Sequence, residues 1–305
     1  MRNRIAQILG MSVMIAVTLV AQQQPAAPAP GPATAPAPAA RGGRGGGGGG
    51  APAVANLNGM RIFIRAGLKS HAEGQHDYPQ FLADWSKLLT DRGARVSGGL
   101  EMPSAKQLAA TDVVVFYKGD AGYMTDEEKA DFDAYIKRGG GVVSLHDALC
   151  GPDPVYFASI FGGAKKHGEQ NFSQGDMKYT ITDKADPIMQ GMSDFILPRD
   201  EAFKLMTWAP TGLKVLATVP MPTGAAEVIP QIWSYEHTVT GGQPARSFVW
   251  MQGHLYANFN DPVIKEMLLR GISWAAKKPI DTLAKSVARQ GGRGVGGSDI
   301  VVPAP

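Results

Sequence analysis

The chain has 305 residues, of which 44% are hydrophobic, and its 30 Lys and Arg against 27 Asp and Glu give a net charge of +3. Its single cysteine, Cys150, excludes an internal disulfide, so packing must stabilise the folded part. The surplus of basic residues lies in the two ends of the chain, and the slightly acidic segment between them gives no support for a nucleic-acid partner.

The beginning of the chain has the pattern of a secretory signal peptide. Arg2 and Arg4 precede an apolar run from Ile5 to Val20, which is short for a transmembrane helix. We therefore expect residues 1–21 to direct export to the periplasm or the outside of the cell and then to be cleaved, leaving no membrane span. An uncleaved anchor is the alternative.

Two further segments contain too few large apolar residues to form a hydrophobic core. Residues 22–55 are rich in Pro, Ala and Gly and contain the run RGGRGGGGGG, and residues 284–305 contain GGRGVGG. Such compositions bury too little apolar surface to offset the entropy of ordering, so we expect a disordered tether and a disordered tail. Residues 56–283 are then expected to form a single folded domain.

Strand and helix signals alternate in the first half of this domain. β-branched and apolar runs predict strands over residues 60–66, 95–97, 112–117 and 142–145. Apolar residues at helical spacing predict a helix over residues 79–92, and a capping box at Thr125 begins a second helix that Gly139 ends. This alternation predicts an α/β fold with a doubly wound, mostly parallel sheet of the flavodoxin-like kind.

The pattern is looser after residue 146. Asp153-Pro154 and Asp261-Pro262 each have the form of a helix start. Further strands are predicted over residues 177–182, 215–219, 228–235 and 247–251. Pro187 and Pro198 indicate loops between these strands.

His146 is the first candidate for function, because it directly follows the buried strand that ends at Leu145. In an open parallel sheet, ligands bind outside the carboxyl ends of the strands, so a polar residue at that position is well placed for chemistry. The alternative is a histidine that only caps the strand and hydrogen-bonds to the backbone.

Other polar residues follow predicted strands or lie in adjacent loops. They are His71, His76, His167, the acidic pair Asp200 and Glu201, and His254. Each histidine alone is more often structural than functional. Because parallel strands place their carboxyl ends on one rim, His76, His146 and His254 are expected to meet there, where neutral imidazoles suit a divalent metal such as zinc, or acid/base catalysis. His71 competes with His76 for this place, and no HExxH or CxxC spacing supports zinc locally.

Aromatic residues near the last strands are candidates for stacking on a sugar ring. The apolar strand context of Trp233 and Trp250 assigns them to the core, so only Tyr256 is expected to line the mouth of a site.

Seven short motifs occur in a fixed order along the chain. They are GGGVVSLHDA, FGGAKKH, DPIMQGM, RDEAF, PQIW, QGH and LLRGISWAA. In this order the series resembles the ThuA-like (trehalose utilisation) family, whose domain belongs to the class I glutamine amidotransferase-like superfamily. The resemblance covers roughly residues 60–277 and implies a flavodoxin-like sheet with helices on both faces.

The resemblance also implies a role in carbohydrate use, with a sugar or oxidised (keto) sugar as the small-molecule substrate. The roles expected on this basis are His146 and His254 as general acid/base groups or metal ligands and Glu201 as their carboxylate partner. The residues expected to contact substrate are His76, His167, Asp147 and Tyr256. A non-catalytic sugar-binding or scaffold domain is the alternative.

One departure from glutamine amidotransferases excludes their chemistry. In those enzymes the strand ends in a cysteine nucleophile, and His146 stands at that place here. An imidazole cannot replace a thiolate that forms a thioester. Cys150 is expected to be a buried small residue rather than a displaced nucleophile.

Overall fold

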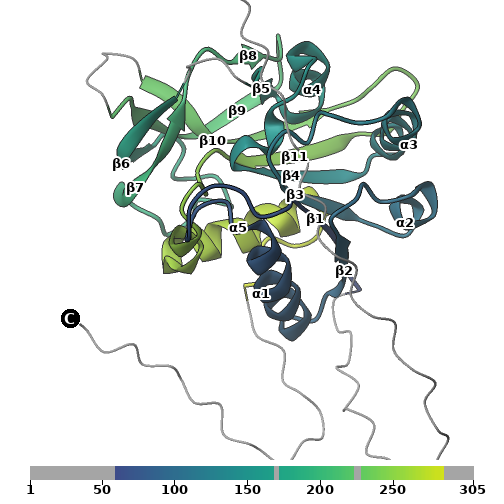
Figure 1. Cartoon of the computed structure of the whole chain (residues 1–305), viewed down its shortest axis with the longest axis horizontal. Helices are drawn as coiled ribbons and strands as arrows, with labels where there is room; N and C mark the ends of the chain where they lie inside the picture. Colours follow the sequence, from purple (N-terminus) through teal and green to yellow (C-terminus); the bar gives the residue numbers. More distant parts are fainter. Residues whose placement is uncertain (1–58, 168–171, 223–227, 285–305) are drawn as a thin grey trace, which may run out of the picture. The chain divides into compact units, whose positions relative to one another are not determined.

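The structure, a computed structural model, describes residues 59–167, 172–222 and 228–284 (Figure 1). The predicted signal peptide, the tether and nearly all of the tail lie outside these residues. Among the described residues, no helix has both the length and the apolar character that are needed to cross a bilayer.

One sheet of nine strands organises the described residues, in the order β2-β1-β3-β4-β11-β10-β9-β6-β7. The first five strands of this order are mutually parallel: β2 (Arg95–Gly99), β1 (Arg61–Ala66), β3 (Val113–Tyr117), β4 (Gly141–Leu145) and β11 (Ala245–Trp250). Their carboxyl ends therefore lie at one edge of the sheet, as the sequence predicts.

Four more strands extend the sheet through antiparallel pairs. They are β10 (Val228–His237), β9 (Leu213–Pro220), β6 (Phe172–Ile181) and β7 (Phe195–Phe203). A separate two-stranded sheet pairs β5 (Gly163–Ala164) with β8 (Thr207–Trp208).

Helices cover both faces of the sheet, which confirms the predicted doubly wound α/β fold (Figure 1). The helices α1 (Tyr78–Asp91) and α5 (Pro262–Ala275) pack on one face. The helices α2 (Ala105–Ala109), α3 (Asp126–Lys137) and α4 (Pro154–Phe161) pack on the other. Strand β1 serves both cores, because its side chains alternate: Ile62 and Ile64 join the first core and Phe63 the second.

Local chemistry explains why these segments are helical. In the capping box of α3, the Glu128 amide donates to Thr125 Oγ1 at 3.2 Å, and the Thr125 amide donates to Glu128 Oε2 at 2.8 Å. Gly139, just beyond this helix, has the positive φ of 84° that suits glycine. Trp233 and Trp250 lie in the core as predicted.

The loop predicted around Pro198 is wrong, because Pro198 lies within β7. This strand is the last in the sheet and pairs only with β6. Along its other edge, backbone N–H groups are not needed for hydrogen bonds to a neighbouring strand. Pro198 and Arg199 also oppose the single residue Asp176, which is a β-bulge. Proline lacks an N–H and is tolerated at such edge and bulge positions.

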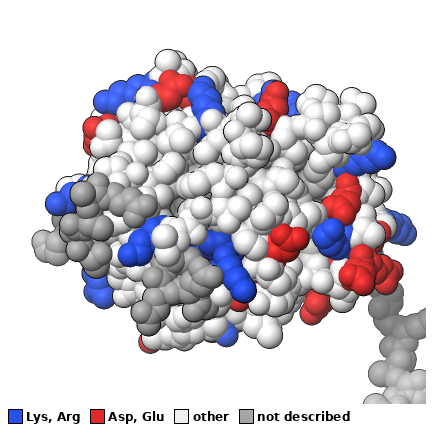
Figure 2. Space-filling model, turned by 90° about the horizontal axis from the view of Figure 1, so that it is seen from above, with Lys and Arg blue, Asp and Glu red and all other residues white. Residues whose placement is uncertain are grey.

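Charged residues of both signs are scattered over the face shown in Figure 2. Most of them lie towards the border of that face, and its centre is uncharged. The described residues that are visible there form no continuous basic surface.

Candidate functional site

His146 begins a short 3₁₀ helix, η1 (His146–Leu149), directly after β4. Its backbone has a φ of 57°, a left-handed conformation that is rare outside glycine and that occurs most often at functional sites. The imidazole is fully buried, and its Nδ1 lies 3.2 Å from the Met251 carbonyl oxygen. A carbonyl only accepts, so Nδ1 carries the hydrogen and Nε2 keeps a lone pair. Burial lowers the pKa of His146 to about 3, so the ring is neutral.

His76 reaches the same place from the loop between β1 and α1. Its backbone amide donates to the His254 carbonyl oxygen at 3.0 Å, which fixes this loop against the residues that follow β11. The ring Nδ1 lies 3.2 Å from Ser70 Oγ, and burial lowers the pKa of His76 to about 2. This second ring is therefore also neutral.

His254 is positioned by the buried carboxylate of Asp200. The backbone amides of Gly253 and His254 each donate to this carboxylate at 3.1 Å, and Asn258 Nδ2 donates to it at 2.5 Å. Gly253 has a φ of 122°, a conformation that few other residues adopt and that aims its amide at Asp200. Burial raises the pKa of Asp200 to about 7 and lowers that of His254.

The three rings converge on one point. His76 Nε2 lies 3.0 Å from His146 Nε2 and 2.9 Å from His254 Nδ1. One nitrogen from each ring lies within 4.8 Å of the others, so the three could bind a single metal ion. Neutral imidazole is the form that binds metals.

Glu201 supplies a carboxylate beside this cluster from β7. Its two oxygens lie 3.6 Å from His146 Nε2 and 3.4 Å from His254 Nδ1. Gln174 Nε2, on the neighbouring strand β6, donates to Glu201 Oε1 at 2.8 Å. The site thus combines three imidazoles with one oriented carboxylate.

A cavity of about 540 Å³ adjoins His76 and contains two more of the predicted residues, Asp147 and His167. Tyr78 donates its hydroxyl to the buried Asp147 at 3.1 Å, and burial raises the pKa of that carboxyl group. His167 is half exposed and places Nδ1 2.9 Å from Asp120 Oδ1. The cavity walls therefore offer both proton donors and proton acceptors.

Two predicted candidates do not belong to the converging histidines. Tyr256 does not line the cavity beside His76; it donates its hydroxyl to Asp84 on α1 at 2.6 Å. His71 is exposed and lines the cavity beside His76, but although its ring centroid is 3.9 Å from that of His76, it does not belong to the converging group.

Cys150 is fully buried, and this burial raises the pKa of its thiol, which disfavours a thiolate nucleophile. It forms a second group of ligand types with Asp120 and His167, but His167 Nδ1 is already paired with the Asp120 carboxylate. The thiol is therefore better explained as a core residue.

Sequence reasoning missed the part played by Asp200 and Gln174. Asp200 lies on β7, 54 residues before His254, whose backbone amide it accepts, and Gln174 lies on β6 and donates to Glu201. The one available signal was the adjacent acidic pair Asp200 and Glu201.

Replacing Asp200 with alanine should destabilise the protein, because the amides of Gly253 and His254 lose their buried acceptor at a cost of about 1–3 kcal/mol each. The matched control is Asp183→Ala, since Asp183 accepts from the Ala185 and Asp186 amides at 3.0 and 3.1 Å in a more exposed turn. Urea unfolding should show a clearly smaller loss for this control than for Asp200→Ala. Equal losses would contradict the positioning role of Asp200.

Acidification should destabilise the metal-free protein through its buried histidines. The pKa values of His76 and His146 are about 2 and 3 in the folded state, against about 6.5 in an unfolded chain. Protons therefore bind the unfolded state preferentially. The contribution of each neutral ring to the free energy of unfolding is fully present above about pH 6.5 and is lost as the pH falls, by about 2 kcal/mol per ring at pH 5.

The buried carboxyl groups of Asp147 and Asp200 act in the opposite direction, because their pKa values are raised. The informative comparison is therefore with His146→Gln. Between pH 7 and pH 5, urea unfolding should show a loss for the unsubstituted protein that exceeds the loss for the variant by about 2 kcal/mol. The same pH dependence in both would contradict a neutral, buried His146.

Comparisons with known proteins agree with this architecture. A family model described as trehalose utilisation (ThuA) matches residues 70–275. No curated protein matches the chain in sequence. A ThuA-like protein from Bacteroides uniformis ATCC 8492 is 17% identical with a TM-score of 0.57, and the match covers 79% of this chain and 100% of that one.

A second solved structure, a ThuA-like protein from Parabacteroides merdae ATCC 43184, is 21% identical with a TM-score of 0.55, covering 72% of this chain and 91% of that one. A glutamine amidotransferase from Thermotoga maritima also matches, with 14% identity and a TM-score of 0.36, over 73% of this chain and 93% of that one. Because the family model spans most of the chain, the protein belongs to the ThuA, or trehalose utilisation, family.

Proposed function

We propose that this protein is a metal-dependent enzyme that acts on a sugar or an oxidised (keto) sugar. The observation that supports it best is the convergence of three buried, neutral imidazoles at the carboxyl edge of the sheet, with nitrogens 2.9 and 3.0 Å apart. Membership of the trehalose utilisation family supports a carbohydrate as the substrate class.

The three histidines fit a divalent ion in both spacing and chemistry. Two nitrogens bonded to one ion at about 2.0–2.1 Å lie roughly 3 Å apart when the bonds meet near a right angle, which is the spacing found here. In each of His146 and His76, Nε2 faces the cluster, and Nδ1 is the outer nitrogen, which points away from it. The outer nitrogens face the Met251 carbonyl and Ser70 Oγ, respectively, and partners of this kind orient a metal-binding imidazole.

An ion held there would polarise a carbonyl or hydroxyl oxygen of a bound sugar. Glu201 lies within 3.6 Å of His146 and His254 and is the group placed to take up a proton. Asp147 faces the adjoining cavity, and its raised pKa suits it to donate one. His76 and His167 are the substrate contacts that we propose in the same cavity.

The proposed chemistry uses no covalent cysteine intermediate. By the resemblance to glutamine amidotransferases, His146 stands where those enzymes carry their cysteine nucleophile, and Cys150 is buried with a raised pKa. Hydrolysis, elimination or isomerisation of a carbohydrate is therefore the class of reaction that we propose.

Elemental analysis of the dialysed protein should find about one divalent ion per chain, because three imidazoles are the full set of protein ligands of a catalytic zinc ion, with water or substrate at the fourth position. His146→Ala should lose that ion together with turnover in a screen of glycosides and their 3-keto derivatives. The control His237→Ala removes a histidine at the opposite edge of the sheet, where it pairs with Ala245 at the start of β11, and should keep both.

The outcomes separate the alternatives. Sub-stoichiometric metal with activity unchanged by chelator would contradict the metal site. A bound ion without turnover of any sugar would favour a non-catalytic sugar-binding domain, the alternative that the sequence leaves open. Turnover that survives His146→Ala would show that His146 is not essential.

Export is the setting that we propose, because residues 1–21 have the pattern of a signal peptide. N-terminal sequencing of the protein from the producing cell's periplasm or medium should begin after residue 21. A cytoplasmic protein that still begins at Met1 would contradict export.

A further inference from the structure

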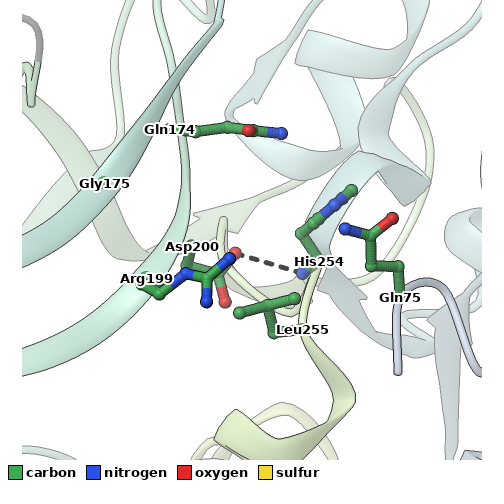
Figure 3. A pocket seen from close by; sticks show the side chains of 7 residues that line it. All are labelled: Gln75, Gln174, Gly175, Arg199, Asp200, His254 and Leu255. Carbon is green, nitrogen blue, oxygen red and sulfur yellow. Dashed lines mark hydrogen bonds between the residues drawn. The ribbon is translucent and has the colours of Figure 1, made fainter. Parts of the chain in front are cut away.

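His254 belongs to the histidine cluster and also lines a second cavity, of about 200 Å³ (Figure 3). Its Nδ1 faces His76 Nε2 at 2.9 Å, and the ring also lines this cavity together with Gln75, Gln174 and Arg199. In Figure 3 the imidazole projects between the amide groups of the two glutamines.

The outer nitrogen of His254 differs from those of the other two rings. His146 and His76 direct their outer nitrogens at the Met251 carbonyl and at Ser70. The Nε2 of His254 is buried and has no hydrogen-bond partner among the described residues. An imidazole that binds metal through Nδ1 carries its hydrogen on Nε2, and that hydrogen normally has an acceptor. Because His254 lines the cavity, a ligand bound there is placed to supply that acceptor.

Arg199 adds a positive charge to the same cavity. It lies in the β-bulge of β7 with a φ of 48°, and bulges of this kind redirect a side chain next to functional sites. Its backbone groups bond to Asp176 and Asn258, but its guanidinium forms no ion pair within the described part of the chain. The neighbouring Asp200 carboxylate is already used by Gly253, His254 and Asn258.

Gln75 adds a further hydrogen-bond donor to the cavity, and Gln174 adds an acceptor. Gln75 uses its side-chain oxygen to accept from the Ala72 amide at 3.3 Å, which leaves its NH₂ group for the cavity. Gln174 donates through its NH₂ group to Glu201, and its carbonyl oxygen is available to the cavity as an acceptor. The cavity therefore offers an imidazole N–H, a guanidinium and an amide as donors.

We propose that this cavity binds the carboxylate of an acidic sugar, with His254 Nε2–H and Arg199 as its hydrogen-bond donors. The proposal rests on the metal-dependent function proposed above, because the bound ion fixes the His254 tautomer. A carboxylate satisfies the buried N–H of His254 and pairs with the guanidinium through charge-assisted bonds. It also gives this metal ligand the outer partner that the protein itself does not provide.

Calorimetric titration of the metal-loaded full chain with glucuronate and with glucose tests the proposal, because the two sugars differ only at the carboxylate. Glucuronate should bind at least about tenfold more tightly, as expected for a charge-assisted hydrogen bond. Arg199→Gln should remove that preference. Arg95→Gln, which changes an exposed arginine at the amino end of β2, should keep it.

A second readout concerns His254 directly. Glucuronate, and not glucose, should shift the ¹⁵N resonance of its Nε2 in NMR spectra of the metal-loaded protein. Equal affinity for both sugars, or a preference that survives Arg199→Gln, overturns the carboxylate site. If metal binding and sugar turnover persist in that case, only this inference fails. A chain that binds no metal overturns both this inference and the proposed function.

Discussion

Three imidazole rings point nitrogens at one another where water has little access, and the properties of the site follow from that arrangement. Burial disfavours the charged form of His76, His146 and His254, so all three rings are neutral. Neutral rings at 2.9–3.0 Å can share hydrogens or can present their lone pairs to a common cation. In His146 the hydrogen bond from Nδ1 to the Met251 carbonyl places the hydrogen on Nδ1. Its Nε2 therefore presents a lone pair to the cluster.

The two halves of the sheet contribute different parts of this site. The parallel half supplies the histidines, because His146 and His254 follow β4 and β11, and the loop after β1 brings His76 between them. The antiparallel half supplies the carboxylates, because β7 carries both Asp200 and Glu201.

Strand β7 is four positions from β11 in the sheet, yet Asp200 binds the amides directly after β11. The antiparallel strands must therefore curve back over the carboxyl edge, and in Figure 1 β6 and β7 are steeply inclined to β11. Register shifts in β10 and in the β6–β7 pair are the irregularities that bend a sheet in this way.

The sequence predicts the parallel half well because its signals are local. Continuous apolar runs, capping residues and glycines define β1, β3, β4 and their helices, and the rule on carboxyl ends then places His146 and His254 at one edge. Cys150 lies in the core for the same local reason.

The antiparallel half could not be predicted in the same way, because long-range pairing decides it. Pro198 makes β7 look like a loop in the sequence, because proline is disfavoured in most strands. The strand accommodates it only because β7 is an edge strand with a bulge at this position. The choice of His76 over His71 depends on a backbone hydrogen bond to His254, 178 residues away along the chain. Tyr256 donates its hydroxyl to Asp84, which lies 172 residues away along the chain, so no local sequence pattern indicates this pair.

The central claim is that the three rings hold a cation and do not merely hydrogen-bond to one another. Anomalous X-ray diffraction from crystals of the dialysed protein, recorded above and below the absorption edge of the metal found by elemental analysis, tests this most directly. If the rings hold a cation, the map has one peak at bonding distance from His76 Nε2, His146 Nε2 and His254 Nδ1. A map without that peak, in which the ring nitrogens stay in direct hydrogen-bonding contact, would contradict it.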